Sequence, residues 1–301
     1  LCSAPVAIAL IPITGWLIAH ERTDQVFFLQ LFANMTNLIL NLLFVMVFEW
    51  GVHGIATSTV ISEISCLFLG LYFCKKVFGW DLIFDYPLLF NKVAWIKLLS
   101  INRDIFIRSL ILQLSIFGSI FFSATYGTVV LAANQLLLQF LLLSSYILDG
   151  FAFAAEVLVG VALGARDRMG FRNASSICGQ WALLGAIGLT VIFCFFGMYL
   201  ITLMTTSIEV QTEALKYVQW LIVSPVLAVA AYTLDGIFFG ATATKYMRRA
   251  MIESFFLFLA SLIVLLPFFE NQGIWIAINL LFIFRALTLI RFYPNVEKAI
   301  V

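Results

Sequence analysis

The feature that most constrains this sequence is a succession of apolar stretches, each long enough to cross a membrane as a helix. The hydrocarbon core of a bilayer is about 30 Å thick, so a helix needs about 20 mostly apolar residues to span it. We therefore predict an all-α polytopic membrane protein that has the lipid bilayer as its partner. On this criterion about nine segments are predicted, over residues 1–19, 26–48, 52–74, 101–126, 128–161, 176–203, 214–240, 246–268 and 272–293.

Charged residues are too scarce for a soluble protein of this length. The chain is 63% hydrophobic and only 11% charged, whereas a soluble domain has about 25% charged residues. A net charge of +1 gives no electrostatic reason to expect a nucleic-acid partner. The five cysteines are far apart and there are only two histidines, so we predict neither a metal site nor a disulfide framework, and no cofactor.

Basic residues alternate between the turns that join these segments. They collect in residues 75–100, 165–172 and 245–249 and after the last segment, and they are absent from the intervening turns. Loops rich in Lys and Arg face the cytoplasm. This pattern predicts a multi-pass protein of the cell (inner) membrane with its C-terminus in the cytoplasm.

An internal repeat indicates how the segments group. Pro225 and Gly273 are separated by nearly the same number of residues as Pro5 and Gly54, and each lies about 220 residues after its counterpart. Such an offset spans six helices, as in transporters built from two parallel repeats. The second repeat begins near Asn102, so the same offset puts the start of the first about 120 residues before Leu1, and we expect about three further helices there. The predicted regions are the remainder of an N-terminal lobe (1–74), a cytoplasmic or interfacial linker (75–100), a six-helix C-terminal lobe (101–293) and a cytoplasmic tail (294–301).

Ionisable residues inside the segments are candidates for a transport pathway, because each costs about 2.5–3.5 kcal/mol to insert at the bilayer centre. Asp149 and Glu156 are seven residues apart, which places both acids on one face of a helix. Asp235 follows Pro225, which should kink its helix, and Glu63 lies in the third segment. The alternative interpretation is that these side chains only join helices through hydrogen bonds.

Two further features are a row of asparagines and an arginine inside the predicted segments. Asn34, Asn37 and Asn41 recur every three or four residues and form a stripe on one helical face. Taken alone, the stripe favours interhelical hydrogen bonding. Arg108 lies one turn inside a helix that begins near Asn102, and it could pair with an acid of the cavity.

Four stretches carry a resemblance to a known family, and each lies at a helix start or inside a helix. The chain resembles, along its whole length, the DinF-like branch (DNA-damage-inducible protein F) of the MATE (multidrug and toxin extrusion) family. By this resemblance the chain is N-terminally truncated, and its segments match helices 4–12 of a twelve-helix, two-lobe fold. The stretches are Asn102-Arg103-Asp104-Ile105-Phe106-Ile107-Arg108, Leu131-Ala132-Ala133-Asn134, Leu148-Asp149-Gly150-Phe151-Ala152-Phe153-Ala154-Ala155-Glu156 and Leu234-Asp235-Gly236-Ile237-Phe238-Phe239-Gly240-Ala241-Thr242.

The resemblance implies a function and a set of residues. It implies a transporter and not an enzyme: a monomeric, cation-coupled (proton or sodium) antiporter that exports organic, often cationic, drugs or metabolites by alternating access. Asn37 and Thr59 match members of a family network in the N-terminal lobe. Asn41 stands where related sequences usually have Asp, and an amide cannot take up a proton. The predicted pathway residues are Asp149, Glu156, Asp235, Asn37, Asn41, Thr59, Asn134 and Arg108.

Three other readings stay open at this point. A lipid-linked sugar flippase of the same superfamily would carry more cationic residues in its cavity than Arg108. An intramembrane enzyme would need clustered acids or a His–acid pair, and the sequence has neither. An inactive remnant is the third reading, because alternating access requires two lobes around one site.

Overall fold

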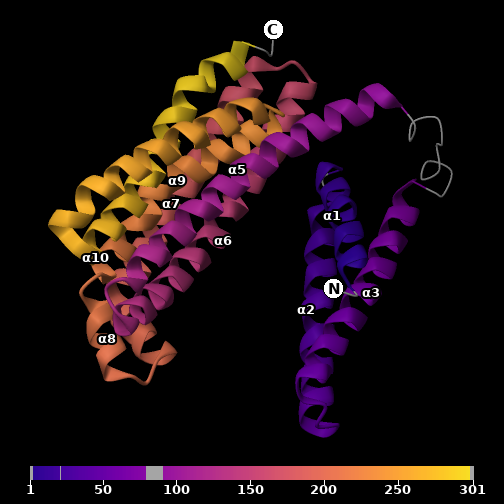
Figure 1. Cartoon of the computed structure of the whole chain (residues 1–301). Helices are drawn as coiled ribbons and strands as arrows, with labels where there is room; N and C mark the ends of the chain where they lie inside the picture. Colours follow the sequence, from indigo (N-terminus) through magenta and orange to yellow (C-terminus); the bar gives the residue numbers. More distant parts are fainter. Residues whose placement is uncertain (1–2, 21, 79–90, 299–301) are drawn as a thin grey trace. The chain divides into compact units, whose positions relative to one another are not determined.

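The computed structural model describes residues 3–20, 22–78 and 91–298, and every regular element in these ranges is helical (Figure 1). Within them, seven helices are long and apolar enough to cross a membrane. The predicted all-α polytopic fold is therefore confirmed. The chain divides into two compact units, Leu1–Lys92 and Val93–Val301, which are described separately.

The first unit is a three-helix layer. Gly70 allows the first and third helices to pack closely, because a Cβ at this position would lie 3.0 Å from the side chain of Ile13. Leu17, Leu29 and Cys66 are buried between the helices. The elements are α1 (Ala4–Ala19), α2 (Thr23–Leu42), its π-helical continuation η1 (Leu43–Val47) and α3 (Gly51–Phe78).

The second unit is a larger helical bundle. Its last helix is interrupted at Glu270, whose backbone is non-helical (φ 49°, ψ −130°). The two halves of this helix lie side by side, since Ser254 and Thr288 are joined by a hydrogen bond of 3.0 Å. The interruption accounts for the two separate segments predicted there. The elements are α5 (Lys92–Ala124), α6 (Thr128–Gly164), α7 (Arg168–Met204), α8 (Ile208–Leu215), α9 (Val218–Gly240) and α10 (Thr244–Lys298).

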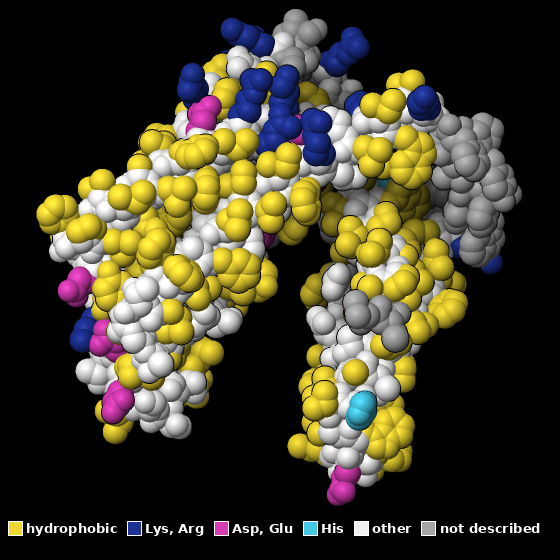
Figure 2. Space-filling view, viewed as in Figure 1, with side chains coloured by type: hydrophobic (Ala, Val, Ile, Leu, Met, Phe, Trp, Pro, Cys, Tyr) yellow, Lys and Arg dark blue, Asp and Glu magenta, His cyan; other side chains and the backbone are white. Residues whose placement is uncertain are grey.

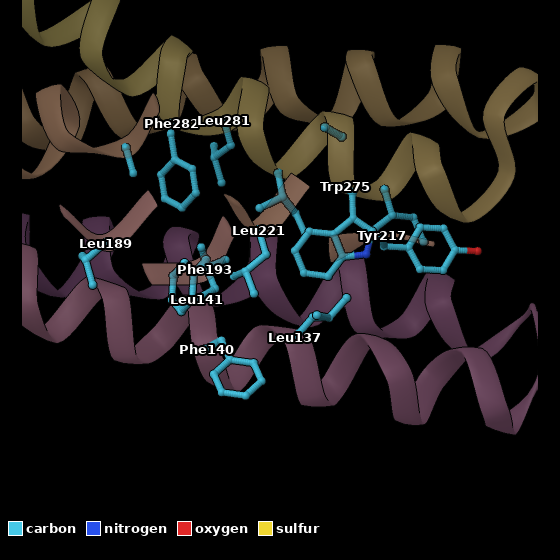
Figure 3. Close-up of a cluster of buried hydrophobic side chains, with 14 of the residues drawn as sticks. Leu137, Phe140, Leu141, Leu189, Phe193, Tyr217, Leu221, Trp275, Leu281 and Phe282 are labelled. Carbon is cyan, nitrogen blue, oxygen red and sulfur yellow. The ribbon is translucent and has the colours of Figure 1, made fainter. Parts of the chain in front are cut away.

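Helix α9 is the centre of this bundle and packs against α6, α7 and α10. Small residues make the closest approach possible: a Cβ on Gly236 would overlap the carbonyl oxygen of Ala152, and one on Gly240 would overlap that of Glu156. Close packing at small residues is the usual way in which membrane helices associate. Figure 3 shows the apolar side chains that fill the bundle around Leu221 and Trp275.

Hydrophobic side chains cover much of the outer surface of both units (Figure 2), as expected where lipid is the solvent. Lys and Arg gather at the end of the second unit that holds the C-terminus. The turns α6–α7 and α9–α10 contribute to this basic end, and both were predicted to be cytoplasmic. The orientation of the chain in the membrane stays a prediction that rests on this asymmetry.

Helix ends differ from the apolar segments in several places. The segment 214–240 is divided at Lys216–Tyr217 into α8 and α9, and α5 begins at Lys92, well before residue 101. Apolar length detects only the part of a helix inside the hydrocarbon, so polar turns at helix ends escape it. Part of the predicted linker 75–100 is thus helical, and residues 79–90 of it lie outside the described ranges.

Candidate functional site

Two arginines from different helices meet at one carboxylate in the second unit. Arg108 of α5 and Arg285 of α10 each donate a hydrogen bond from Nη2 to Oδ2 of Asp235, the latter over 2.5 Å. Asp235 is 6% exposed and Arg285 only 3%. Removing one partner of a buried pair leaves an uncompensated charge, so the three side chains depend on one another.

Aromatic rings hold both guanidinium groups in place. Cζ of Arg108 lies 5.3 Å from the centroid of the Phe239 ring, and Cζ of Arg285 lies 5.5 Å from that of Tyr232. The Tyr232 hydroxyl in turn shares a 2.6 Å hydrogen bond with Ser145 of α6. Both rings come from α9, which also carries Asp235, so the central helix positions the whole cluster.

Asp149 of α6 lies within electrostatic range of this cluster without being bonded to it. Its half-buried side chain interacts through charge with Asp235, Arg108 and Arg285. Within the described part of the chain it forms no hydrogen bond or ion pair. Asp149 is therefore a free acid beside an acid that two arginines already occupy.

Glu156 shares a helix with Asp149 but not its surroundings. Its side chain is half-buried, and among the residues that the structure describes it forms no ion pair with an arginine or lysine. The structure thus brings Asp149, Asp235 and Arg108 together and leaves Glu156 outside the cluster.

A cavity of about 220 Å³ opens among α5, α6, α9 and α10 next to this cluster. Tyr232, whose ring contacts Arg285, and its hydrogen-bond partner Ser145 are part of its wall. The remaining wall combines leucine, isoleucine and phenylalanine with a few polar side chains. The polar lining residues are Gln113, Ser115, Ser119, Gln135, Gln139, Ser145 and Tyr232.

Asn134 belongs to a separate buried network. Its amide nitrogen donates to Ser123 at 2.7 Å and to Asn271 at 2.6 Å, and its oxygen accepts from Trp275 Nε1 at 2.9 Å. Asn134 is 15 residues from Asp149, or about 22 Å along a helix. Its contacts are those of a joint between α5, α6 and α10, and its predicted role in the pathway stays a prediction.

The first unit holds a ladder of amides and hydroxyls. Asn41 donates to Asn37 Oδ1 at 2.9 Å, Asn37 donates to Thr59 Oγ1 at 3.3 Å, and Ser58 donates to Asn41. The structure thus brings Asn37, Asn41 and Thr59 together in one hydrogen-bonded network, and their role in a transport pathway stays a prediction. Glu63 lines the same cavity of about 360 Å³ as Asn37 and Thr59.

Arg285 was missed by the sequence analysis. It lies in the predicted segment 272–293, and an arginine costs as much to insert as an aspartate. Applying that cost to bases as well as acids would have found it. Among the residues that the structure describes, no group of His, Cys, Asp and Glu could hold a metal ion.

The model of the MatE family matches residues 105–265 of this chain. DNA damage-inducible protein F of Escherichia coli (strain K12) is 34% identical over 293 residues, which cover 95% of this chain and 62% of that protein. Multidrug and toxin extrusion protein 1 of Homo sapiens is 25% identical over 272 residues, 86% of this chain and 46% of that protein. The chain thus spans less than two thirds of the length of these relatives.

Solved structures show the same fold. The Vibrio cholerae MATE transporter VcmN in its bent form superposes with a TM-score of 0.81 at 19% identity, over 94% of this chain and 65% of that chain. The outward-facing conformation of a multidrug resistance MATE family transporter of the MOP superfamily gives 0.83 at 16% identity, over 95% and 65%. At these identities the likeness concerns the fold alone.

Proposed function

This chain belongs to the MatE family of transporters, and on that premise we propose that it works as, or within, a cation-coupled antiporter that exports small organic compounds by alternating access. Members of the family are membrane transporters and not enzymes. The coupling ion, proton or sodium, the monomeric state and the cytoplasmic C-terminus are part of this proposal.

The observation that carries the proposal is the unpaired carboxyl of Asp149. An acid inside the membrane costs free energy, and Asp149 has no described partner that offsets this cost. A proton or a sodium ion can therefore bind Asp149 without first breaking an ion pair. Asp235 differs, because a cation there would have to displace Arg108 and Arg285.

Binding of a cation at Asp149 changes the charge of the cluster beside the cavity. With both acids ionised, two arginines face two carboxylates. With Asp149 neutralised, one positive charge is in excess. In alternating access, such a change can favour one of two packings of the bundle.

The ladder in the first unit cannot itself be the coupling group. Asn37, Asn41 and Thr59 can exchange hydrogen bonds but cannot take up or release a proton near neutral pH. We therefore assign them to positioning helices and lining a path, and Asp149 to coupling.

A lipid-linked sugar flippase, the alternative function, is expected to carry more cationic residues in its cavity. Arg285 adds a second arginine beside Arg108, but both share the single carboxylate of Asp235. A protein of multidrug and toxin extrusion is among the relatives, so we retain the exporter as the proposal.

The test is transport by the purified protein in proteoliposomes. An imposed proton or sodium gradient should drive the counter-movement of a trapped dye, and the ion that drives it identifies the coupling cation. If neither gradient drives movement of any dye tested, the inactive-remnant reading would replace this proposal.

A further inference from the structure

We propose that a groove along α9, between α7 and α10, binds one anionic phospholipid of the surrounding bilayer. Arg172 holds the phosphate of the headgroup, and an acyl chain lies in the apolar part of the groove. The ligand is a membrane lipid and not the transported compound, so this inference goes beyond the proposed transport function.

The groove has a buried floor and two separate walls, and its volume is about 540 Å³. Helix α9 provides the floor with Val229, Thr233 and Ile237, all of them buried. Leu183 of α7 and Ile290 of α10 line the two sides and are 43% and 52% exposed. The groove therefore opens onto the apolar surface of the bundle.

The walls are joined only at the end that lies among the basic residues of the second unit (Figure 2). There the rings of Phe171 and Tyr293 lie 5.5 Å apart between centroids, and Arg172 bonds to Glu297. Further along α7, Gly179 has no side chain to cover the floor. A Cβ at this position would lie 4.0 Å from the nearest atom, in Thr233, so there is room above the floor.

Polarity changes along the groove as it does along a phospholipid. Arg172, Ser175 and Ser176 line the end near the start of α7, whereas Leu183 and Val229 line the groove further along. Arg172 and Leu183 are 11 residues apart, or about 16 Å along a helix. One leaflet of the hydrocarbon core is about 15 Å deep. A chain that extends from a headgroup at Arg172 would thus follow the groove to the middle of the bilayer.

The charges at the polar end favour an anion. Arg168 and Arg172 both donate from Nε to Oε1 of Glu297, over 2.8 and 2.5 Å, so two positive charges share one negative charge. The acid Asp167 is offset by its neighbour Arg166. A phosphodiester with one negative charge balances the remaining excess.

The guanidinium of Arg172 is also free to bind a phosphate. Its side chain is 57% exposed, and in the part of the chain that the structure describes only its Nε is bonded. The Nη groups can therefore donate to two phosphate oxygens at once, the geometry that suits an arginine. The ion pair with Glu297 need not break for this to happen.

The test is native mass spectrometry of the purified 301-residue chain in detergent, which counts the lipid molecules bound to each protein. Three probes are titrated: dioleoylphosphatidylglycerol, dioleoylphosphatidylcholine, which has the same chains but no net charge, and glycerol 3-phosphate, which has no chains. We expect the first phosphatidylglycerol to bind about fivefold more tightly than phosphatidylcholine, the factor for one basic residue near a membrane surface. Glycerol 3-phosphate should not bind measurably.

Arg172→Gln tests the headgroup contact. Arg168 keeps its bond to Glu297 in this variant, and the preference for phosphatidylglycerol should disappear. Arg249→Gln is the matched control, because Arg249 is an exposed arginine of the same basic end that does not line the groove. It removes the same charge and should preserve the preference.

Gly179→Phe tests the apolar part, because its ring would cover the floor of the groove. It should weaken the binding of both lipids about tenfold, the factor for excluding two methylene groups. Gly188→Phe is the control, since Gly188 is an exposed position of the same helix outside the groove, and it should leave binding unchanged.

Equal binding of the two lipids overturns the proposal, as does a preference that survives Arg172→Gln or is lost equally in Arg249→Gln. Unchanged lipid binding in Gly179→Phe also overturns it, and so does binding of glycerol 3-phosphate as tight as that of phosphatidylglycerol, which would identify a site for free phosphate. If one groove variant does not fold, the other variant and the preference of the unaltered chain decide. The measurement requires no gradient, so its outcome is independent of transport.

Discussion

Arg285 and Asp235 are 50 residues apart in the sequence, yet their side chains form an ion pair of 2.5 Å in which both are more than nine-tenths buried. Arg108, from a third helix, donates to the same oxygen. The cluster therefore joins α5, α9 and α10 through one atom. A charge in such a place stabilises the fold only while its partners remain.

The first prediction concerns Asp235→Asn. The amide leaves two buried arginines without a carboxylate, so we expect the free energy of unfolding to fall by about 3–5 kcal/mol. Thermal unfolding of the purified protein in detergent would measure this. Glu253→Gln is the matched control. The Glu253 side chain is 43% exposed, and its ion pair with Arg291 is long, at 3.8 Å, so this substitution should change stability little. Equal stability of the two variants would contradict the structural role of the cluster.

The second prediction concerns the approach of α9 to α6. A methyl group at Gly236 would overlap the backbone of Ala152, so Gly236→Ala should separate the helices and destabilise the protein by about 1–3 kcal/mol. Gly150→Ala, on the neighbouring helix, has open space around its Cβ and should be neutral or slightly stabilising. Comparing the two unfolding temperatures checks the packing, and an unchanged Gly236→Ala variant would show that the helices lie further apart.

The third prediction concerns pH and the short helix α8, outside the membrane-spanning segments. Burial alone would raise the pKa of Glu213, but hydrogen bonds from Lys216, at 2.6 Å, and Tyr217 hold this pKa below its ordinary value. A lowered pKa in the folded state means that the stabilisation is present at neutral pH. It is lost as the pH falls below about 4, where an unperturbed glutamate takes up its proton.

Glu213→Gln should therefore unfold at a lower temperature than the unaltered protein at pH 7, and the difference should disappear near pH 3. Glu209→Gln, at an exposed position in the first turn of the same helix, serves as the control and should show no such dependence. A difference for Glu213→Gln that persists in acid would contradict the assignment.

Much of the fold follows from segment length and the position of basic residues, because a bilayer requires apolar helices of one length and a basic cytoplasmic side. The turn at Glu270 was predicted on these grounds. The break at Lys216–Tyr217 was not predicted, because the single apolar segment 214–240 runs across it. Helix ends that project into the polar interface, such as the start of α5, carry no signal in an apolar count.

The site could be predicted only residue by residue. The cost of inserting a charge marks Asp149 and Asp235 singly, and Arg108 was found by its place near a helix start, but the sequence separation of 127 residues between Arg108 and Asp235 says nothing about which charges meet. That pairing depends on the close packing of α9 at the centre of the bundle. The pairing leaves Asp149, and not Asp235, as the unpaired acid, and the spacing of these residues in the sequence could not predict this.

The central claim is that Asp149 is the coupling acid, and gradient-driven dye movement in proteoliposomes tests it most directly. Two dyes, the cationic ethidium and the anionic fluorescein, are assayed with the unaltered protein, Asp149→Asn and the half-exposed control Glu253→Gln. The account predicts that Asp149→Asn abolishes gradient-driven movement of whichever dye is transported, while Glu253→Gln preserves it. Undiminished transport by Asp149→Asn would contradict it.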